Sequence, residues 1–112
     1  MKQVVLDTNF ILTCVKQRID FFEQLGLDYK IMIPIQVITE LKRVDKTGLA
    51  LKIISKNSFT EIDLGVSYVD KGLIKYAKAN SSAIIATLDK ELKDKILNKK
   101  MIIRERKRLV VV

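Results

Sequence analysis

An apolar run that ends in a carboxylate opens the chain and constrains its fold more than any other segment. Val4, Val5 and Leu6 lead directly to Asp7, and Phe10 begins an apolar stretch typical of a helix. A buried strand followed at once by a helix is a common opening of an α/β sheet. In open sheets of this kind, ligands bind at the carboxyl ends of the strands. We therefore expect Asp7 at a ligand-binding edge.

The rest of the chain alternates between strand and helix patterns. Apolar runs predict strands at 4–6, 30–33, 83–87, 101–103 and 109–112, with a weaker strand or extended loop at 59–64. Helical spacing of apolar residues predicts helices at 8–16, 21–25, 36–44, 46–56, 70–79 and 90–97. This order predicts an α/β fold with a mainly parallel central sheet and helices on both faces, in a single domain over residues 1–112.

Polar residues at the expected helix starts suggest caps. Thr8 or Asn9 is expected to cap the first helix and Asp20 the second, because short oxygen-bearing side chains accept hydrogen bonds from N–H groups there. In the last helix we expect Leu92 and Leu97 to face inwards.

Composition excludes several classes of function. The chain has no His and a single Cys, Cys14, so it cannot build a His-dependent triad, an internal disulfide or a zinc site of the usual His and Cys ligands. A reduced, cytoplasmic compartment is the simplest expectation for a lone thiol. No apolar run approaches the roughly 18 residues of a membrane-spanning helix, so no membrane partner is expected.

The basic charge gathers near the end of the chain. The formal net charge is +8, and residues 90–108 hold nine Lys or Arg against three acids. Such clustering favours a polyanion such as nucleic acid, although a solvated surface or a charged edge hairpin that resists aggregation is an equal alternative. The expected contacts with a nucleic-acid backbone are Lys99, Lys100, Arg104, Arg106, Lys107 and Arg108.

Four acidic residues occupy positions that a parallel sheet would bring to one edge. Asp89 follows the 83–87 strand as Asp7 follows the first, Asp70 opens a helix, and Glu40 lies in the helix after the 30–33 strand. Convergent carboxylates repel one another unless a cation neutralises them, and their oxygens suit Mg²⁺ or Mn²⁺. Such ions promote hydrolysis of phosphodiesters. The alternatives are that the three aspartates are helix caps and that Glu40 is a solvated helix residue.

The same acids lie in segments that resemble the motifs of PIN-domain nucleases. The segments are Val-Leu-Asp-Thr-Asn at 5–9, Ile-Pro at 33–34 with Val-Ile-Thr-Glu-Leu at 37–41, Tyr-Val-Asp at 68–70, and Ala-Thr-Leu-Asp-Lys-Glu-Leu at 86–92. The runs 85–95 and 102–104 look most like the branch of the family that processes small-subunit ribosomal RNA. The resemblance extends over nearly the whole chain.

This resemblance implies a PIN fold and a metal-dependent endoribonuclease with Mg²⁺ or Mn²⁺ as cofactor and RNA as substrate. The metal-binding and catalytic acids would be Asp7, Glu40, Asp70 and Asp89. Thr8, Asn9 and Thr87 would orient those carboxylates or a water molecule.

One position departs from the family pattern and leaves alternatives open. Many family members have a second acid directly after the third site, where this chain has Lys71, and the segment between Glu40 and Asp70 is short. A non-catalytic PIN-like protein that binds RNA or takes part in assembly is therefore one alternative. A ribonuclease toxin of a toxin–antitoxin pair is another. Candidate partners are ribosome-assembly factors, an antitoxin, and a second copy docked through the apolar 109–112 tail.

Overall fold

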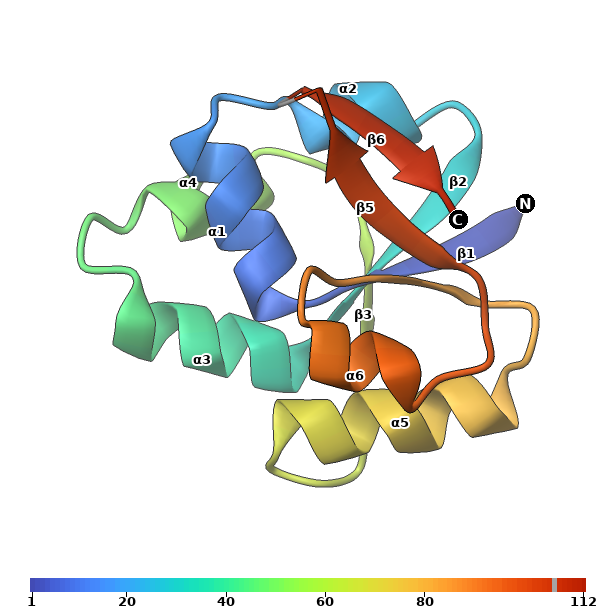
Figure 1. Ribbon diagram of the computed structural model, residues 1–112. Helices are drawn as coiled ribbons and strands as arrows, with labels where there is room; N and C mark the ends of the chain where they lie inside the picture. The colour runs from blue at the N-terminus through green and yellow to red at the C-terminus, as the bar shows by residue number, and fades with distance from the viewer. Residues whose placement is uncertain (106) are drawn as a thin grey trace.

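A mainly parallel sheet forms the centre of the molecule (Figure 1). The computed structural model describes residues 1–105 and 107–112, and within these ranges six strands form one sheet in the order β3-β2-β1-β4-β5-β6. The strands are β1 (Lys2–Leu6), β2 (Tyr29–Pro34), β3 (Thr60–Ile62), β4 (Ile84–Ala86), β5 (Lys100–Arg104) and β6 (Arg108–Val111). Neighbouring strands are parallel except for β5 and β6. The expected mainly parallel sheet is confirmed, and the weak third strand is formed.

Helices cover both faces of the sheet. The helices are α1 (Thr8–Lys16), α2 (Phe21–Leu25), α3 (Ile35–Val44), α4 (Leu49–Ser55), α5 (Val69–Ala79) and α6 (Lys90–Asp94), and they form two groups. Helices α1, α3 and α4 contact one another, whereas α5 contacts β4 and lies beside α6 (Figure 1). Right-handed crossovers place the two groups on opposite faces, because the connections that contain α1, α3 and α4 run towards β3 while those that contain α5 and α6 run the other way.

The strand order reverses between β1 and β4, and this reversal positions the site. The chain leaves β1 for β2 on one side and later returns to β4 on the other side of β1. Leu6 pairs with Ala86, and the Asp7 N–H donates a hydrogen bond of 2.9 Å to the Ala86 carbonyl. Sheets of this kind bind ligands in the crevice at such a switch point. Asp7 therefore lies where the topology provides a binding edge.

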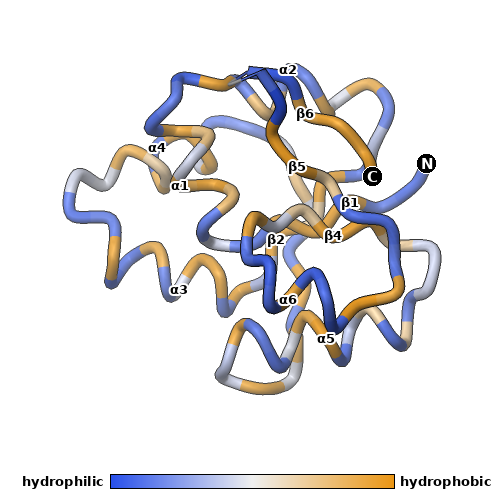
Figure 2. Tube along the Cα trace, in the orientation of Figure 1, coloured by the Kyte–Doolittle hydropathy of each residue, from blue (hydrophilic) through white to orange (hydrophobic). Residues whose placement is uncertain are grey.

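The central strands form the core because both of their faces are covered. Val5 and Ile85 are completely buried, and Leu41 of α3 and Leu73 of α5 are equally inaccessible. Strands covered on both faces consist of continuous apolar runs instead of alternating ones, and β1 and β4 follow this rule. Figure 2 shows hydrophobic residues along β5 and β6 and hydrophilic ones around α6 and the turn between β5 and β6.

Three local expectations have clear outcomes. The prediction that Thr8 or Asn9 caps the first helix is wrong, because the helix begins directly after the strand and Asp7 itself occupies the N-cap position. The predicted cap at Asp20 is confirmed. The prediction that Leu97 faces inwards is wrong: α6 ends at Asp94, and Leu97 lies beyond it in a loop with its side chain fully exposed.

The C-terminal tail completes the sheet. Strand β6 pairs with β5 along its length, and Val111 lies opposite Met101. In the described part of the chain, no helix is long and apolar enough to cross a membrane.

Candidate active site

Asp7 is a buried carboxylate with both oxygens engaged. Its Oδ1 accepts a hydrogen bond of 2.8 Å from the Thr8 N–H, and its Oδ2 accepts one of 2.8 Å from the Thr87 hydroxyl. The pKa of Asp7 is raised to about 6, chiefly by burial; the hydrogen bonds from Thr87 and Thr8 oppose this rise, and the charges of Asp70 and Glu40 add to it. The ionised form is therefore costly, and a nearby cation would favour it.

Two threonines surround this carboxylate. Thr87 is fully buried, and its Oγ1 also accepts a hydrogen bond of 3.2 Å from the Asp89 N–H. Among the described residues, the buried Thr8 Oγ1 has no hydrogen-bond partner. Asn9, the third predicted supporting residue, is exposed on the first turn of α1. Thr87 thus connects Asp7 to the start of α6.

Asp89 is the N-cap of α6 and is half-buried. Its Oδ1 accepts hydrogen bonds from the N–H groups of Glu91 at 2.9 Å and Leu92 at 3.3 Å. The capping interpretation of Asp89 is therefore correct. Asp89 can cap the helix and also bind a ligand, because both capping bonds use Oδ1 and leave Oδ2 for another partner. The charge of Asp89 also acts on Asp70.

Asp70 and Glu40 lie on two other helices, and their charges act on Asp7. Asp70 lies in the first turn of α5, and its pKa is raised by partial burial and by the charges of Asp89 and Glu40, with Lys95 acting in the opposite sense. Glu40 is half-buried on α3 and forms an ion pair of 3.7 Å with Arg43. The charges of Glu40, Asp89 and Lys95 thus reach Asp70 from segments that are distant in the sequence, whereas Glu40 and Arg43 are one helical turn apart.

The four carboxylates interact electrostatically but do not form a closed cluster. Within residues 1–105 and 107–112, no three Asp, Glu or Cys side chains lie close enough together to hold a metal ion. The chemistry of the donors nevertheless suits Mg²⁺ or Mn²⁺, since all four are carboxylates. The pKa of Asp7 is raised by burial and, to a smaller extent, by the charges of Asp70 and Glu40, which also matches a site that a cation would stabilise.

Sequence reasoning missed a hollow beside Glu40. It has a volume of about 330 Å³ and is lined by Glu40, Arg43, Ser67, Tyr68 and Val69. Tyr68 was visible in the motif that ends in Asp70, but its role in lining a hollow depends on how α3 approaches the loop before α5. No local pattern in the sequence indicates that approach.

Leu64 contacts both α3, which carries Glu40, and α5, which carries Asp70. This connection was not predicted from the sequence. The Gln36 side chain on α3 accepts a hydrogen bond of 3.1 Å from the Leu64 N–H and donates one of 2.7 Å to Asp63. On α5, a Cβ added to Gly72 would lie only 2.7 Å from the Leu64 Cβ. Only glycine permits this close approach of α5 to the loop. A glycine within a helical pattern was the one signal in the sequence.

The predicted basic contacts are divided between the two ends of β5. Lys100 begins β5 level with Ile85, and the exposed Lys99 precedes it. Arg104, Lys107 and Arg108 lie at the turn between β5 and β6, while Arg106 lies outside the described residues.

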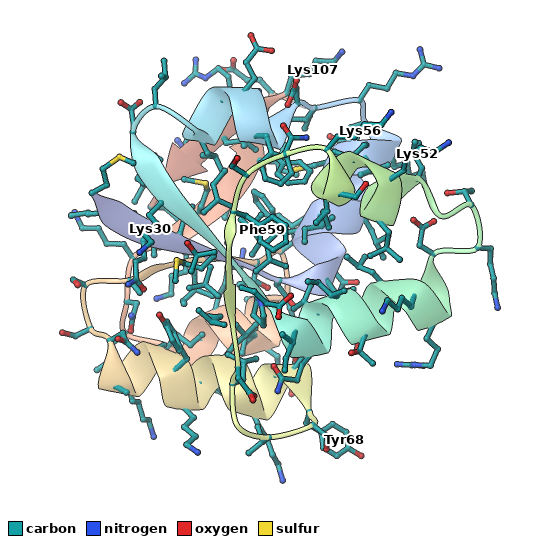
Figure 3. The ribbon with its side chains drawn as sticks, turned by 180° about the vertical axis from the view of Figure 1, so that it is seen from behind. Lys30, Lys52, Lys56, Phe59, Tyr68 and Lys107 are labelled. Carbon is teal, nitrogen blue, oxygen red and sulfur yellow. The ribbon has the colours of Figure 1, made fainter. Side chains whose placement is uncertain are left out.

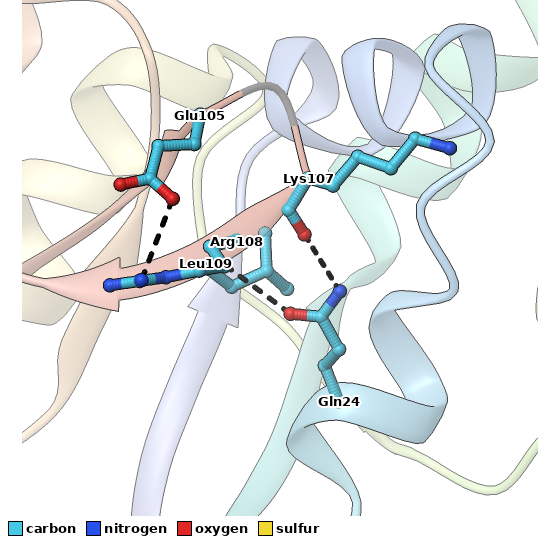
Figure 4. A network of polar contacts seen from close by, with 5 residues as sticks. All are labelled: Gln24, Glu105, Lys107, Arg108 and Leu109. Atoms are coloured by element: carbon cyan, nitrogen blue, oxygen red, sulfur yellow. Dashed lines mark hydrogen bonds and ion pairs between the residues drawn. The ribbon is translucent and has the colours of Figure 1, made fainter.

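The turn between β5 and β6 rests against α2. Gln24 donates a hydrogen bond of 2.9 Å to the Lys107 carbonyl and accepts one of 3.3 Å from the Leu109 N–H (Figure 4). Arg108 forms an exposed ion pair of 3.5 Å with Glu105. The turn therefore has a defined support on the body of the protein.

Two proteins are similar in sequence to most of this chain. Ribonuclease VapC4 of Methanocaldococcus jannaschii is 29% identical over 96% of this chain and 94% of the relative. The rRNA-processing protein fcf1 of Schizosaccharomyces pombe is 31% identical over 83% of this chain, which spans about half (52%) of that protein.

Solved structures share the fold. The PIN domain endonuclease Utp24 superposes with a TM-score of 0.83 at 27% identity, covering 97% of this chain and 90% of that one. VapBC2 from Rickettsia felis, bound to a DNA fragment from its promoter, gives a TM-score of 0.63 at 16% identity over 87% of this chain and 97% of that one, a likeness of fold alone. The family model described as PIN like domain matches residues 4–108, and the chain therefore belongs to the PIN-like domain family.

Proposed function

We propose that this protein is an endoribonuclease that hydrolyses RNA phosphodiester bonds with a bound Mg²⁺ or Mn²⁺. The observation that carries the proposal is the buried Asp7 at the switch point of the sheet, with a pKa raised to about 6 by burial and by the charges of Asp70 and Glu40. Similarity to a ribonuclease and to a PIN domain endonuclease supports it.

The four acids would hold the cation, each from a different segment. Asp7 would hold it from the end of β1, Glu40 from α3, Asp70 from α5 and Asp89 from the start of α6. Glu40, Asp70 and Asp89 would turn towards Asp7, since the described side chains are not gathered into a coordination sphere. A bound divalent cation lowers the pKa of a water molecule and stabilises the leaving oxygen.

The supporting residues would orient the carboxylates. The Thr87 hydroxyl holds Oδ2 of Asp7 and the backbone of Asp89, so one buried side chain positions two of the acids. Thr8 and Asn9 would orient Asp7 or a water molecule from the first turn of α1.

The basic residues near the C-terminus would hold the RNA backbone. Contacts with phosphate position a strand without selecting its sequence. We assign this role to the set predicted from the sequence: Lys99, Lys100, Arg104, Arg106, Lys107 and Arg108.

The test is a cleavage assay with a matched pair of variants. The protein is incubated with single-stranded RNA and Mn²⁺ or Mg²⁺, with and without a chelator. We expect cutting that the chelator and Asp7→Asn both abolish, while Asp28→Asn, an exposed acid before β2, cuts like the parent. Binding of RNA without cutting, unchanged in Asp7→Asn, would favour the non-catalytic alternative, to which Lys71 points.

Two cellular roles are compatible with this chemistry. Likeness to VapC4 over nearly its whole length supports a toxin with an antitoxin partner, and likeness to fcf1 and Utp24 supports ribosomal RNA processing with assembly factors. Growth arrest on expression, relieved by the product of a neighbouring gene, would identify the toxin. Accumulation of ribosomal RNA precursors after depletion would identify the processing enzyme. A cytoplasmic location and a homodimer stay predictions.

A further inference from the structure

Tyr68 is a solvent-exposed aromatic side chain directly before the helix that carries Asp70, one of the four proposed metal-binding acids. It occupies the N-cap position of α5, two residues before Asp70, and 73% of its surface is exposed. Figure 3 shows it at the end of the molecule, projecting away from the body of the protein. Tyr68 also lines the hollow of about 330 Å³ to which Glu40 contributes. An exposed aromatic side chain therefore adjoins Glu40, one of the proposed metal ligands.

One cation lies over this ring, and a second lines the same hollow. The Lys71 ammonium lies 5.9 Å from the centre of the Tyr68 ring, within the range of a cation–π contact. Arg43, on the same hollow, is 73% exposed at its side chain and pairs with Glu40 at 3.7 Å. An ion pair whose arginine is largely exposed is weak, so the guanidinium can exchange its partner for a phosphate.

We propose that Tyr68 is a stacking platform for an unpaired nucleobase of the RNA, with Lys71 and Arg43 contacting the phosphates on either side of that base. The proposal rests on the proposed function and names its substrate as single-stranded at the site of cutting. Every base has a π-face, so a lone aromatic ring accepts any of them, whereas a base stacked within a duplex is not available. Lys71, at the position where many family members have an acid, thereby becomes a contact for the substrate.

Binding of RNA to variants that do not cut it provides the first test. All proteins carry Asp7→Asn, and the probe is a short single-stranded RNA oligonucleotide. Because stacking on one aromatic residue contributes substantially, we expect Tyr68→Ala to weaken binding by roughly 5- to 100-fold and Tyr68→Phe to stay within about twofold of the parent. Leu27→Ala is the matched control. Leu27 is 89% exposed but lies just before the amino end of β2, whereas Tyr68 follows the carboxyl end of β3.

A fluorescent reporter provides the second test. The chain contains no Trp, so Tyr68→Trp introduces a single indole at the platform and Leu27→Trp introduces one at the control position. We expect the single-stranded oligonucleotide to quench the first protein strongly and the second little. A duplex of the same sequence should leave both nearly unchanged.

The outcomes separate this inference from the proposed function. Equal binding by parent and Tyr68→Ala, or equal quenching of the two indoles, would overturn the platform. If the protein with Asp7 intact still cuts RNA in that case, the endoribonuclease proposal stands. If the protein with Asp7 intact neither binds nor cuts RNA, the proposed function is wrong and the platform with it.

Discussion

The hydroxyl of Thr87 donates a hydrogen bond of 2.8 Å to Oδ2 of Asp7, joining two residues that are 80 positions apart in the chain. The bond is buried and connects the carboxyl ends of β1 and β4. The same hydroxyl accepts the Asp89 N–H. One side chain therefore links two of the four acids that we assign to the metal.

Replacing Thr87 by Val removes this link while keeping the shape of the side chain. We expect Thr87→Val to raise the pKa of Asp7 further, because the lost hydrogen bond stabilises its ionised form. Removal of a residue that orients a metal ligand typically costs about 10- to 100-fold in metal affinity or activity. Cleavage rates measured against Mn²⁺ concentration check this, with Thr87→Ser retaining most of the activity. Equal rates for the Val and Ser proteins would contradict it.

The burial of Asp7 makes the stability of the metal-free protein dependent on pH. Its pKa is 3.8 ordinarily and about 6 in the folded protein, so the native state holds the proton more tightly than the unfolded chain. The stability that Asp7 contributes is complete below pH 3.8 and is lost as the pH rises through about 6. The shift corresponds to roughly 3 kcal/mol.

Asp7→Asn removes that dependence because the amide does not ionise. We expect the variant to be about 1 kcal/mol less stable than the parent near pH 4, where one hydrogen bond is lost, and roughly 2 kcal/mol more stable above pH 7. Urea unfolding in the presence of a chelator at both pH values measures the difference. Asp28→Asn is the control. A difference between Asp7→Asn and parent that stays constant with pH would show that Asp7 is not desolvated in the folded state.

Binding of a divalent cation should stabilise the fold. At about 100 times its Kd, a ligand adds roughly 2.7 kcal/mol, which for a domain of this size raises Tm by about 10 °C. We expect Mn²⁺ to produce such a shift in the parent and in Asp28→Asn, and to produce much less in Asp7→Asn. A shift of the same size in all three proteins would place the bound cation elsewhere.

Gln24 should determine how firmly the turn between β5 and β6 is held. Gln24→Ala removes both hydrogen bonds to that turn, and we expect a loss of about 1 kcal/mol in the free energy of unfolding together with faster exchange of the Leu109 amide. Hydrogen exchange followed by NMR reports the effect directly. The neighbouring Glu23→Ala leaves these bonds in place and should not accelerate the exchange of Leu109.

Gly72 should tolerate no side chain. A Cβ at this position would lie 2.7 Å from the Leu64 Cβ, so α5 would have to move. We expect Gly72→Ala to cost about 1–3 kcal/mol even though alanine favours helices, and to reduce cleavage because α5 carries Asp70. Urea unfolding and RNA cutting measure the two effects, with Lys78→Ala on the exposed face of α5 as the control. Full stability in Gly72→Ala would show that the loop at Leu64 yields easily.

Much of the fold could be predicted from the sequence because its signals are local. The apolar runs that became β1 and β4 are continuous since both faces of these strands are covered, and the periodicity at 36–44 follows from the buried Val37 and Leu41. The position of Asp7 directly after β1, and that of Asp89 shortly after β4, follow from the same patterns. The helix cap was misassigned because a shift of one residue in the start of α1 leaves the pattern almost unchanged.

The environment of each side chain was decided only by the tertiary structure. The bond between Thr87 and Asp7, the raised pKa of Asp7, the hollow beside Tyr68 and the close approach of Gly72 to Leu64 all arise between segments that are distant in the chain. Burial, electrostatic interaction and packing depend on which residues are neighbours in space, and the local periodicity of the sequence does not indicate those neighbours. The sequence by itself therefore determined the order of strands and helices and the residue types at the strand ends, whereas folding decided which of those residues meet.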